Sequence, residues 1–291
     1  MEMVTKELVK TIFPKRQVLG HKGTYGHVVV IGGSKWYRGA SIFASMASLK
    51  MGAGLCTLAS IEKVLQTASF LCPELLFFPL KEKKGCIVQK KSLKKKIQLA
   101  GAVVLGCGIG RENSIPFLTK CCIKNVISLC KKFSIPLILD ADGLNFLSTQ
   151  KNIQLPQKTV LTPHPKEMAR LLNLSVKDVM ENPAKIAQDA AKKYSSVVVL
   201  KCSKNYITDG ENLLITDSGN SALSKGGSGD VLAGMIAGSL SQGEFSVPLV
   251  ACACYLHGRA GKIASENLTE YSVFARDIID AIPRVLLEVL Q

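Results

Sequence analysis

Short apolar segments alternate with longer amphipathic segments along most of the chain. Runs of three to five residues, rich in valine, isoleucine and leucine, are typical of strands that are buried on both faces. Segments between many of these runs, such as Ile115–Phe133 and Pro183–Tyr194, repeat their apolar residues at helical spacing. This alternation predicts an α/β protein with a mainly parallel central sheet and helices on both faces.

The expected strands and helices cover the chain without a Pro-, Gly- or Ser-rich linker and without an internal repeat, so we expect a single domain over residues 1–291. The expected strands are His27–Ile31, Leu55–Ala59, Leu75–Phe78, Val103–Leu105, Leu137–Leu139, Thr159–Leu161 and Val197–Leu200. After Lys201 the pattern changes to a hairpin over Tyr206–Ile215, which turns at Asp209–Gly210. Further helices are expected at Ala40–Met51, Asp230–Leu240, Val247–Ala264 and Phe274–Leu290.

Polar and glycine-rich loops follow several of the expected strands. In open parallel sheets, ligands bind beyond the carboxyl ends of the strands. These loops are therefore expected to line one edge of the sheet together with Gly226–Asp230. They are Gly32–Gly39, Gly106–Arg111, Asp140–Asn145, Thr162–Glu167 and Lys201–Asn205.

The stretch Gly226-Gly-Ser-Gly-Asp230 runs directly into the apolar helical pattern of residues 231–240. Glycines without Cβ atoms allow the backbone to approach a ligand closely, and the first amides of a helix form an anion site. Asp230 falls in the first turn, where we expect the helix dipole to keep its carboxylate ionised as a base. The alternative is an ordinary glycine-rich turn with an acidic cap. The spacing of a Walker P-loop is absent, because Lys225 precedes the glycines.

The other loops carry weaker signals. Gly106–Gly110 lacks the spacing of a dinucleotide fingerprint, so a tight turn explains it equally well. The carboxylates and amide of Asp140–Asn145 would orient a substrate, bind water around a metal or cap a helix. In Thr162–Pro165 two prolines hold His164 on a stiff loop, which favours a binding role over a packed core histidine. The other histidines show no paired spacing for a metal site.

Composition narrows the classes of partner. The net charge is +15, and eight lysines fall within Lys81–Lys96. A solvated surface explains this run, and attraction of anionic metabolites or nucleic acid is the alternative. Aromatic residues make up only 6% and do not interleave with the lysines, so nucleic acid is not expected as the main partner.

The cysteines and the N-terminal segment indicate a cytoplasmic protein. The ten cysteines include no C-x-x-C pair, and several lie in apolar or helical patterns, as expected for buried thiols in a reducing compartment. Met1–Arg16 carries charges throughout and has no apolar core of a signal peptide. No apolar run reaches the roughly 18 residues that a membrane span needs, so no membrane partner is expected.

Five motifs occur in an order that resembles the NAD(P)H-hydrate dehydratase family, from about His21 to the C-terminal helix. They are Gly39–Ser41, Gly106–Gly110, Leu139–Asn145, Thr162–Pro165 and Gly226–Asp230. The resemblance implies a ribokinase-like three-layer sandwich and a lyase of nicotinamide nucleotide repair. Such an enzyme dehydrates the S epimer of hydrated NADH or NADPH with ADP, giving AMP and phosphate, or with ATP, and with Mg²⁺.

The resemblance also implies roles for residues of this chain. Asp230 would be the catalytic base, and Ala40, Gly108, His164 and Asp230 would contact the hydrated dinucleotide. Glu167 would help to organise Mg²⁺. The adenine nucleotide would be held by Lys201, Cys202, Ser203, Lys204, Asn205, Gly227, Ser228 and Gly229. The usual Lys-Gly-x-x-Thr of the family is Lys-Cys-Ser-Lys-Asn in this chain, which loses the glycine and the threonine.

The expected partners are hydrated NADH or NADPH, an adenine nucleotide and other copies of the chain, with a homotetramer favoured. A separate epimerase would act in the same pathway. Two alternatives share the motifs: a small-molecule kinase of the ribokinase superfamily, and a binding protein that senses dinucleotides. The histidine loop Thr162–Pro165 and the segment Asp140–Asn145 favour the dehydratase over the kinase, and Asp230 argues against a mere binding protein.

Overall fold

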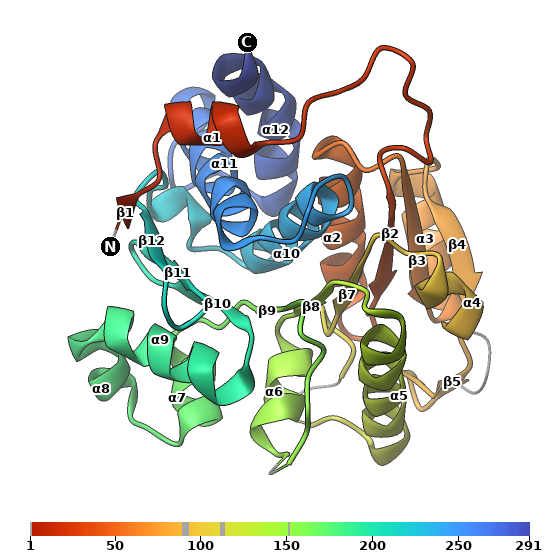
Figure 1. Cartoon of the computed structure of the whole chain (residues 1–291). Coiled ribbons are helices and arrows are strands. Elements are labelled where there is room, and N and C mark those ends of the chain that lie inside the picture. The colour runs from red at the N-terminus through yellow and green to blue at the C-terminus, as the bar shows by residue number, and fades with distance from the viewer. Residues whose placement is uncertain (1, 89–92, 111–113, 151) are drawn as a thin grey trace.

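The computed structural model describes residues 2–88, 93–110, 114–150 and 152–291. Within these ranges a ten-stranded sheet crosses the molecule in the order β1-β12-β11-β10-β9-β8-β7-β2-β3-β4 (Figure 1). Its strands are β1 (Glu2–Met3), β2 (His27–Ile31), β3 (Leu55–Ser60), β4 (Leu76–Pro79), β7 (Ala102–Leu105), β8 (Leu137–Leu139), β9 (Thr159–Leu161), β10 (Val197–Lys201), β11 (Asn205–Thr208) and β12 (Leu213–Thr216).

Helices cover both faces of this sheet, which confirms the expected three layers (Figure 1). One layer contains α1 (Lys6–Ile12), α2 (Arg38–Lys50), α10 (Ser228–Leu240), α11 (Val247–Asn267) and α12 (Ala275–Leu290). The opposite layer contains α5 (Phe117–Phe133), α6 (Asp142–Ser148), α7 (Pro165–Leu172), α8 (Val176–Glu181) and α9 (Pro183–Tyr194). Near the β4 edge, α3 (Glu62–Leu71) packs on α2 and α4 (Leu93–Gln98) packs on α5.

The strand order places a topological switch point between β2 and β7. From β2 the chain moves outward through β3 to β4, and it then returns to β7 on the other side of β2 and continues through β8 to β10. All neighbouring strands are parallel except in the pairs β10–β11 and β11–β12. The loops after β2 and β7 therefore diverge at the carboxyl edge, where sheets of this kind bind their ligands.

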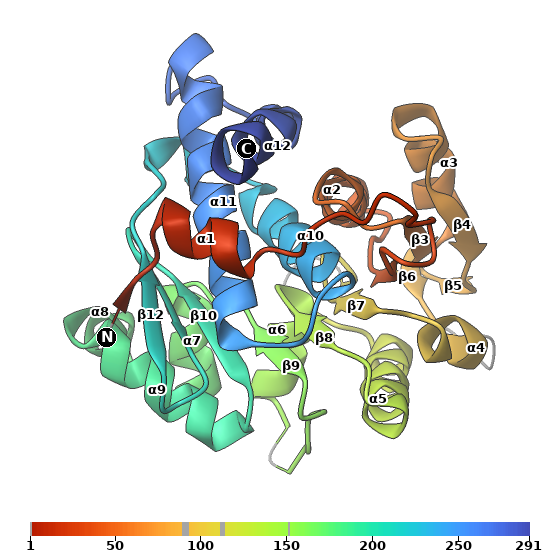
Figure 2. The same cartoon turned by 45° about the horizontal axis from the view of Figure 1, so that its top comes forward.

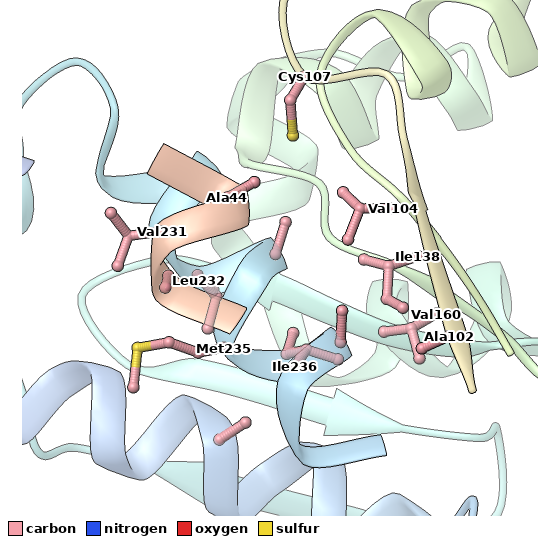
Figure 3. Packing of buried hydrophobic residues seen from close by; sticks show 14 of the residues in the cluster. Ala44, Ala102, Val104, Cys107, Ile138, Val160, Val231, Leu232, Met235 and Ile236 are labelled. Carbon is pink, nitrogen blue, oxygen red and sulfur yellow. The ribbon is translucent and has the colours of Figure 1, made fainter. Parts of the chain in front are cut away.

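Helix α10 lies in the centre of the molecule and packs against both α2 and α11 (Figure 2). Small and apolar residues make up nearly all of it, and every residue from Val231 to Leu240 is buried. Figure 3 shows Ile236 of α10 on the side of the labelled strand residues and Val231 and Met235 on the opposite side, so the helix packs apolar side chains on both sides. A helix with no exposed face is held firmly, so its first turn has a fixed position at the carboxyl edge of the sheet.

Every expected strand is present within one residue of its expected bounds, because each is a local apolar run. The sequence pattern did not indicate β1, which pairs in parallel with the distant strand β12, or the small hairpin of β5 (Glu82–Lys83) and β6 (Cys86–Ile87). It also missed three short helices: α6 and α7, whose first residues lie inside loops expected to bind ligand, and α8, which begins after its own cap at Ser175.

The structure shows where most of the lysines of the basic segment and all of the cysteines lie. In the lysine-rich segment, Lys81, Lys83, Lys84, Lys94 and Lys95 are exposed, whereas Lys90 and Lys91 lie outside the described residues, as does Arg111 of the glycine loop. All ten cysteines are described and none forms a disulfide; Cys121 and Cys202 are at least partly exposed, and the others are buried. Among the described helices none is long and apolar enough to cross a membrane.

The close approach of α2 and α10 depends on glycine. A Cβ atom at Gly234 would lie 2.1 Å from the backbone oxygen of Ala44, so the helices would have to move apart. We expect Gly234→Ala to lower the free energy of unfolding by about 2 kcal/mol despite the better helix propensity of alanine. Gly226→Ala is the matched control, because a Cβ atom there meets no atom within 4 Å. Equal stability of the two variants in chemical denaturation would contradict this packing.

Candidate active site

The first turn of α10 presents unpaired backbone amides. Gly227 caps the helix with φ 96° and without a side-chain hydrogen bond. Ser228 N–H donates to the Lys225 carbonyl and Val231 N–H to the Gly227 carbonyl. Among the described residues, the amides of Gly229 and Asp230 between them have no backbone acceptor. The expected helix N-terminus with free amides is therefore present, and this geometry suits an anion.

Two cavities meet at this turn. The first cavity, of about 700 Å³, lies at the switch point and reaches Asp230. The second cavity, of about 900 Å³, reaches Ser228 and Gly229 from the other side. The first is lined by Tyr37, Ala40, Gly108, Ser114, Ile115, Lys120, Ala141, Asp142, Asn145, Ser148, Thr149, Arg170 and Asp230. The lining of the second includes His164, Lys201, Cys202, Ser203, Asn205, Thr216, Asp217, Asn220, Lys225, Ser228, Gly229 and His257.

The end of β8 sends two carboxylates in different directions. Ala141 has φ 49°, a left-handed conformation that is strained for a residue other than glycine. Asp140, just before it, is buried, and its Oδ1 accepts hydrogen bonds from Lys201 Nζ at 2.9 Å and from Thr162 Oγ1 at 2.7 Å. Asp142, just after it, lines the first cavity. The strained residue thus separates a carboxylate that binds Lys201 from one that faces the first cavity.

Lys201 brings a positive charge to the first turn of α10. A Cβ atom at Gly229 would lie 3.2 Å from its Nζ, which places the ammonium group beside the turn. Burial lowers the pKa of Lys201, but the carboxylates of Asp140, Glu167 and Asp230 outweigh this effect and raise the pKa above its ordinary value. The second cavity therefore contains a permanent ammonium group next to unpaired amides, a combination that suits a phosphate.

Asp230 behaves differently from the expectation based on the helix dipole. Burial, followed by repulsion from the Asp140 carboxylate, raises its pKa to about 7. Desolvation and the Asp140 carboxylate therefore oppose the expected effect of the helix dipole, and Asp230 exchanges its proton near neutral pH. A carboxyl group that titrates near neutrality is well matched to a proton acceptor in catalysis.

His164 and Glu167 form a capping box at the start of α7. The imidazole Nδ1 accepts hydrogen bonds from the amides of Lys166 and Glu167, and Glu167 Oε2 accepts one from the His164 amide at 2.9 Å. Burial and the nearby Lys201 lower the pKa of His164 to about 4, so the ring is neutral. Burial, with repulsion from Asp140, raises the pKa of Glu167 to about 7. His164 is not a packed core histidine, since 44% of its side chain is exposed.

The structure divides the expected site residues between the two cavities. Ala40, Gly108 and Asp230 line the first cavity, but His164 lines the second. Most of the residues expected to hold the nucleotide line the second cavity: Lys201, Cys202, Ser203, Asn205, Ser228 and Gly229. Lys204 instead pairs with Asp217 at 3.0 Å, and Gly227 serves as the helix cap; neither is among the residues that line the cavity.

Sequence reasoning missed several cavity residues. Arg170 and Lys120 bring positive charge to the first cavity, and His257 contacts Ser228 Oγ at 3.3 Å in the second. Burial lowers the pKa of His257 to about 4, so its ring is neutral. His257 lies within an apolar helical pattern, and Arg170 and Lys120 lie among many other basic residues. The only signal for the last two was their position shortly after loops that had been identified as candidates.

The carboxylates offer oxygen ligands for a divalent cation. In the described part of the chain, one group of three ligand atoms lies within 4.8 Å, from Cys107, Asp140 and Asp230. Burial raises the pKa of the Cys107 thiol well above its ordinary value, so it stays protonated and is a poor ligand. The remaining carboxylates suit Mg²⁺, which binds one or two carboxylates together with phosphate oxygens and water.

Comparison with known proteins identifies relatives along nearly the whole chain. A profile of the NAD(P)H-hydrate dehydratase family matches residues 28–284. A bifunctional NAD(P)H-hydrate repair enzyme from Moorella thermoacetica is 33% identical over 98% of this chain, and the match covers 53% of that enzyme. The chain spans about half the length of the curated relatives that it matches in this way.

Solved structures extend the likeness to the fold. A ribokinase-like superfamily protein from Enterococcus faecalis superposes with a TM-score of 0.87 at 28% identity, over 100% of this chain and 97% of that one. The ADP/ATP-dependent NAD(P)H-hydrate dehydratase of Bacillus subtilis, crystallised with ATP and Mg²⁺, gives a TM-score of 0.83 at 26% identity, over 99% and 98% of the chains. The expected ribokinase-like fold is confirmed.

The raised pKa of Asp230 predicts a pH-dependent cost to stability. A carboxyl group with a higher pKa in the folded than in the unfolded protein makes stability fall as pH rises from about 4 through about 7. Asp230→Asn removes this cost, so at pH 8 we expect the variant to be more stable than the wild type by roughly 2 to 4 kcal/mol. At pH 4 the difference should vanish in denaturant unfolding.

Asp178→Asn is a control for which we expect the opposite effect of pH on the difference in stability from the wild type. The hydrogen bond from Ser175 lowers the pKa of this exposed carboxylate, so its contribution is present at pH 8 and is lost as pH falls through the acid range. If the Asp230→Asn variant were less stable than the wild type at pH 8, the ionised Asp230 carboxylate would stabilise the folded protein, and the prediction would be wrong.

Proposed function

Because the chain belongs to the NAD(P)H-hydrate dehydratase family, we propose that it converts the S epimer of hydrated NADH or NADPH back to NADH or NADPH. An adenine nucleotide is the co-substrate, with ADP giving AMP and phosphate. The observation that carries the proposal is the first turn of α10, which separates two cavities. Asp230 lines one, and Gly229 lines the other beside Lys201. This arrangement suits group transfer between two bound molecules.

The hydrated nicotinamide ring occupies the first cavity, where Ala40 and Gly108 leave room for a flat ring and Asp230 reaches the C6 hydroxyl. The adenine nucleotide occupies the second cavity, held by the residues from Lys201 to Asn205. Its terminal phosphate binds the unpaired amides of Gly229 and Asp230 and the ammonium group of Lys201. The two reacting groups then meet at the first turn of α10.

The chemistry follows from the leaving group. Hydroxide leaves carbon poorly, whereas phosphate leaves readily. Asp230 accepts the proton of the C6 hydroxyl as its oxygen attacks the terminal phosphorus of ADP, and AMP departs. The ring-nitrogen lone pair then expels phosphate from C6, and loss of a proton from C5 restores the double bond of NADH. The amides of α10 and Lys201 stabilise the negative charge on the transferring phosphoryl group.

Mg²⁺ would neutralise charge on the nucleotide phosphates. The carboxyl groups of Asp140, Glu167 and Asp230 lie close to the ammonium group of Lys201, and repulsion from Asp140 contributes to the raised pKa of both Glu167 and Asp230. A cation held by phosphate oxygens, with Asp140 and Glu167 nearby, would relieve this repulsion. The neutral His164 ring, in the second cavity, would contact the nucleotide side of the reaction rather than the nicotinamide ring.

The proposal also covers the domain organisation of the enzyme, its cellular compartment, its oligomeric state and an accompanying epimerase. Residues 1–291 form one domain, and the single ten-stranded sheet, whose strands lie between Glu2 and Thr216, supports this. The enzyme works in the cytoplasm as a homotetramer, together with a separate epimerase. Hydration of a flat ring produces both epimers at C6, and Asp230 approaches that carbon from a single side, so another activity must convert the unreactive epimer.

The direct test is to follow absorbance of NADH while the purified protein is incubated with hydrated NADH and with ADP or ATP in turn. We expect NADH to return only when a nucleotide is present, in amounts that match the AMP or ADP formed. Accumulation of a stable phosphoester would favour the alternative of a ribokinase-superfamily kinase. Return of NADH without a nucleotide would exclude phosphoryl transfer as the driving step.

Asp230→Asn separates catalysis from binding. The amide keeps the size of the side chain but cannot accept the proton, so kcat should fall at least about a hundredfold. The Kd for nucleotide should stay within a few-fold, because the backbone amides of α10 are unchanged. In the wild type, kcat/KM should rise with pH through about 7 as Asp230 loses its proton. A variant that retains a tenth of the activity would show that another group takes the proton.

A further inference from the structure

Helix α5 carries a stripe of lysines that leads away from the first cavity. Lys120, Lys124 and Lys131 are spaced by four and seven residues, so they project from one side of the helix. At 1.5 Å per residue the stripe is about 16 Å long. Lys120 lines the first cavity. Lys124 and Lys131 line a separate groove of about 480 Å³.

This groove, called the α5 groove, adjoins the first cavity along both of its walls. On α5, Lys120 of the cavity and Lys124 of the groove are one helical turn apart. On the other wall, Thr149 lines the cavity and the next residue, Gln150, lines the groove. Figures 1 and 2 show the segment that leads into β9, from residue 152 on, running between α6 and α5. The α5 groove is lined by Lys124, Ile127, Ser128, Lys131, Gln150, Asn152, Ile153 and Gln154.

The lysines of the stripe lack acidic partners. Lys131 Nζ donates to the neutral amide oxygen of Gln154 at 2.7 Å. Within the described residues, no carboxylate forms an ion pair with Lys120, Lys124 or Lys131. Isoleucines lie on both walls, Ile127 on α5 and Ile153 opposite. Two apolar walls with amides and two lysines suit a nucleoside that carries a phosphate.

We infer that the α5 groove binds the adenosine half of the hydrated dinucleotide, and that Lys124 and Lys131 bind its 2′-phosphate. The inference rests on the proposed function, which places the nicotinamide ring beside Asp230 and the co-substrate in the second cavity. The rest of the dinucleotide must then leave the first cavity by another route, and the lining residues of the α5 groove follow directly on those of the first cavity. Since the 2′-phosphate is the only difference between the two substrates, the enzyme prefers hydrated NADPH to hydrated NADH.

The test compares kcat/KM for hydrated NADPH and hydrated NADH, with ADP as co-substrate. In the double variant Lys124→Gln, Lys131→Gln we expect about a tenfold loss for hydrated NADPH, mainly through KM, and a change of less than about twofold for hydrated NADH. The loss should shrink at high salt, because exposed charges are screened. The control Lys94→Gln, Lys95→Gln makes the same charge change on exposed residues of α4 and should alter neither value.

A binding measurement separates failure of this inference from failure of the proposed function. With the second cavity saturated by AMP, adenosine 2′,5′-bisphosphate should bind the wild type about tenfold more tightly than the Lys124→Gln, Lys131→Gln variant. If the wild type shows this difference but no turnover, the proposed function is wrong and the α5 groove remains a 2′-phosphate site. Equal losses for both dinucleotides, or equal binding of the bisphosphate to both proteins, would overturn the inference.

Discussion

The ion pair between Lys201 Nζ and Asp140 Oδ1, at 2.9 Å, organises the site. It joins the ends of β10 and β8 and holds the ammonium group against the first turn of α10. Because Lys201 pairs with Asp140, Asp230 forms no ion pair with any described residue and lies close to a second carboxylate. Its pKa near 7 follows from that arrangement. A direct pair between Lys201 and Asp230 would have kept Asp230 ionised and weakened it as a proton acceptor.

The strand order creates the two cavities that meet beside this ion pair. The switch point between β2 and β7 opens the first cavity, while the ends of β9 and β10 bound the second. Helix α10 begins where the two cavities meet and is buried along its length, so its amides and Asp230 cannot move independently. The cost of this arrangement is local: a strained Ala141, and carboxyl groups held at raised pKa.

The features that could be predicted from the sequence are those that a local pattern of residues determines. Each parallel strand is a short apolar run, and the residue types of Gly226–Asp230 alone indicate the start of a helix. The pKa of Asp230 could not be predicted, because it depends on burial and on Asp140, 90 residues earlier in the chain. The pairing of β1 with β12, the placement of His164 in the second cavity and the contribution of Arg170 and Lys120 also arise from contacts between distant segments.

The central claim is that the hydroxyl oxygen at C6 leaves the substrate as part of phosphate. Preparing the hydrate from NADH in ¹⁸O-water labels this oxygen, and turnover with ADP in ordinary water then reveals where it goes. We expect one ¹⁸O atom in each inorganic phosphate released, as measured by mass spectrometry. If the label appeared in water and the phosphate carried no ¹⁸O, nucleotide hydrolysis would be separate from dehydration, and Asp230 would not act between the two cavities.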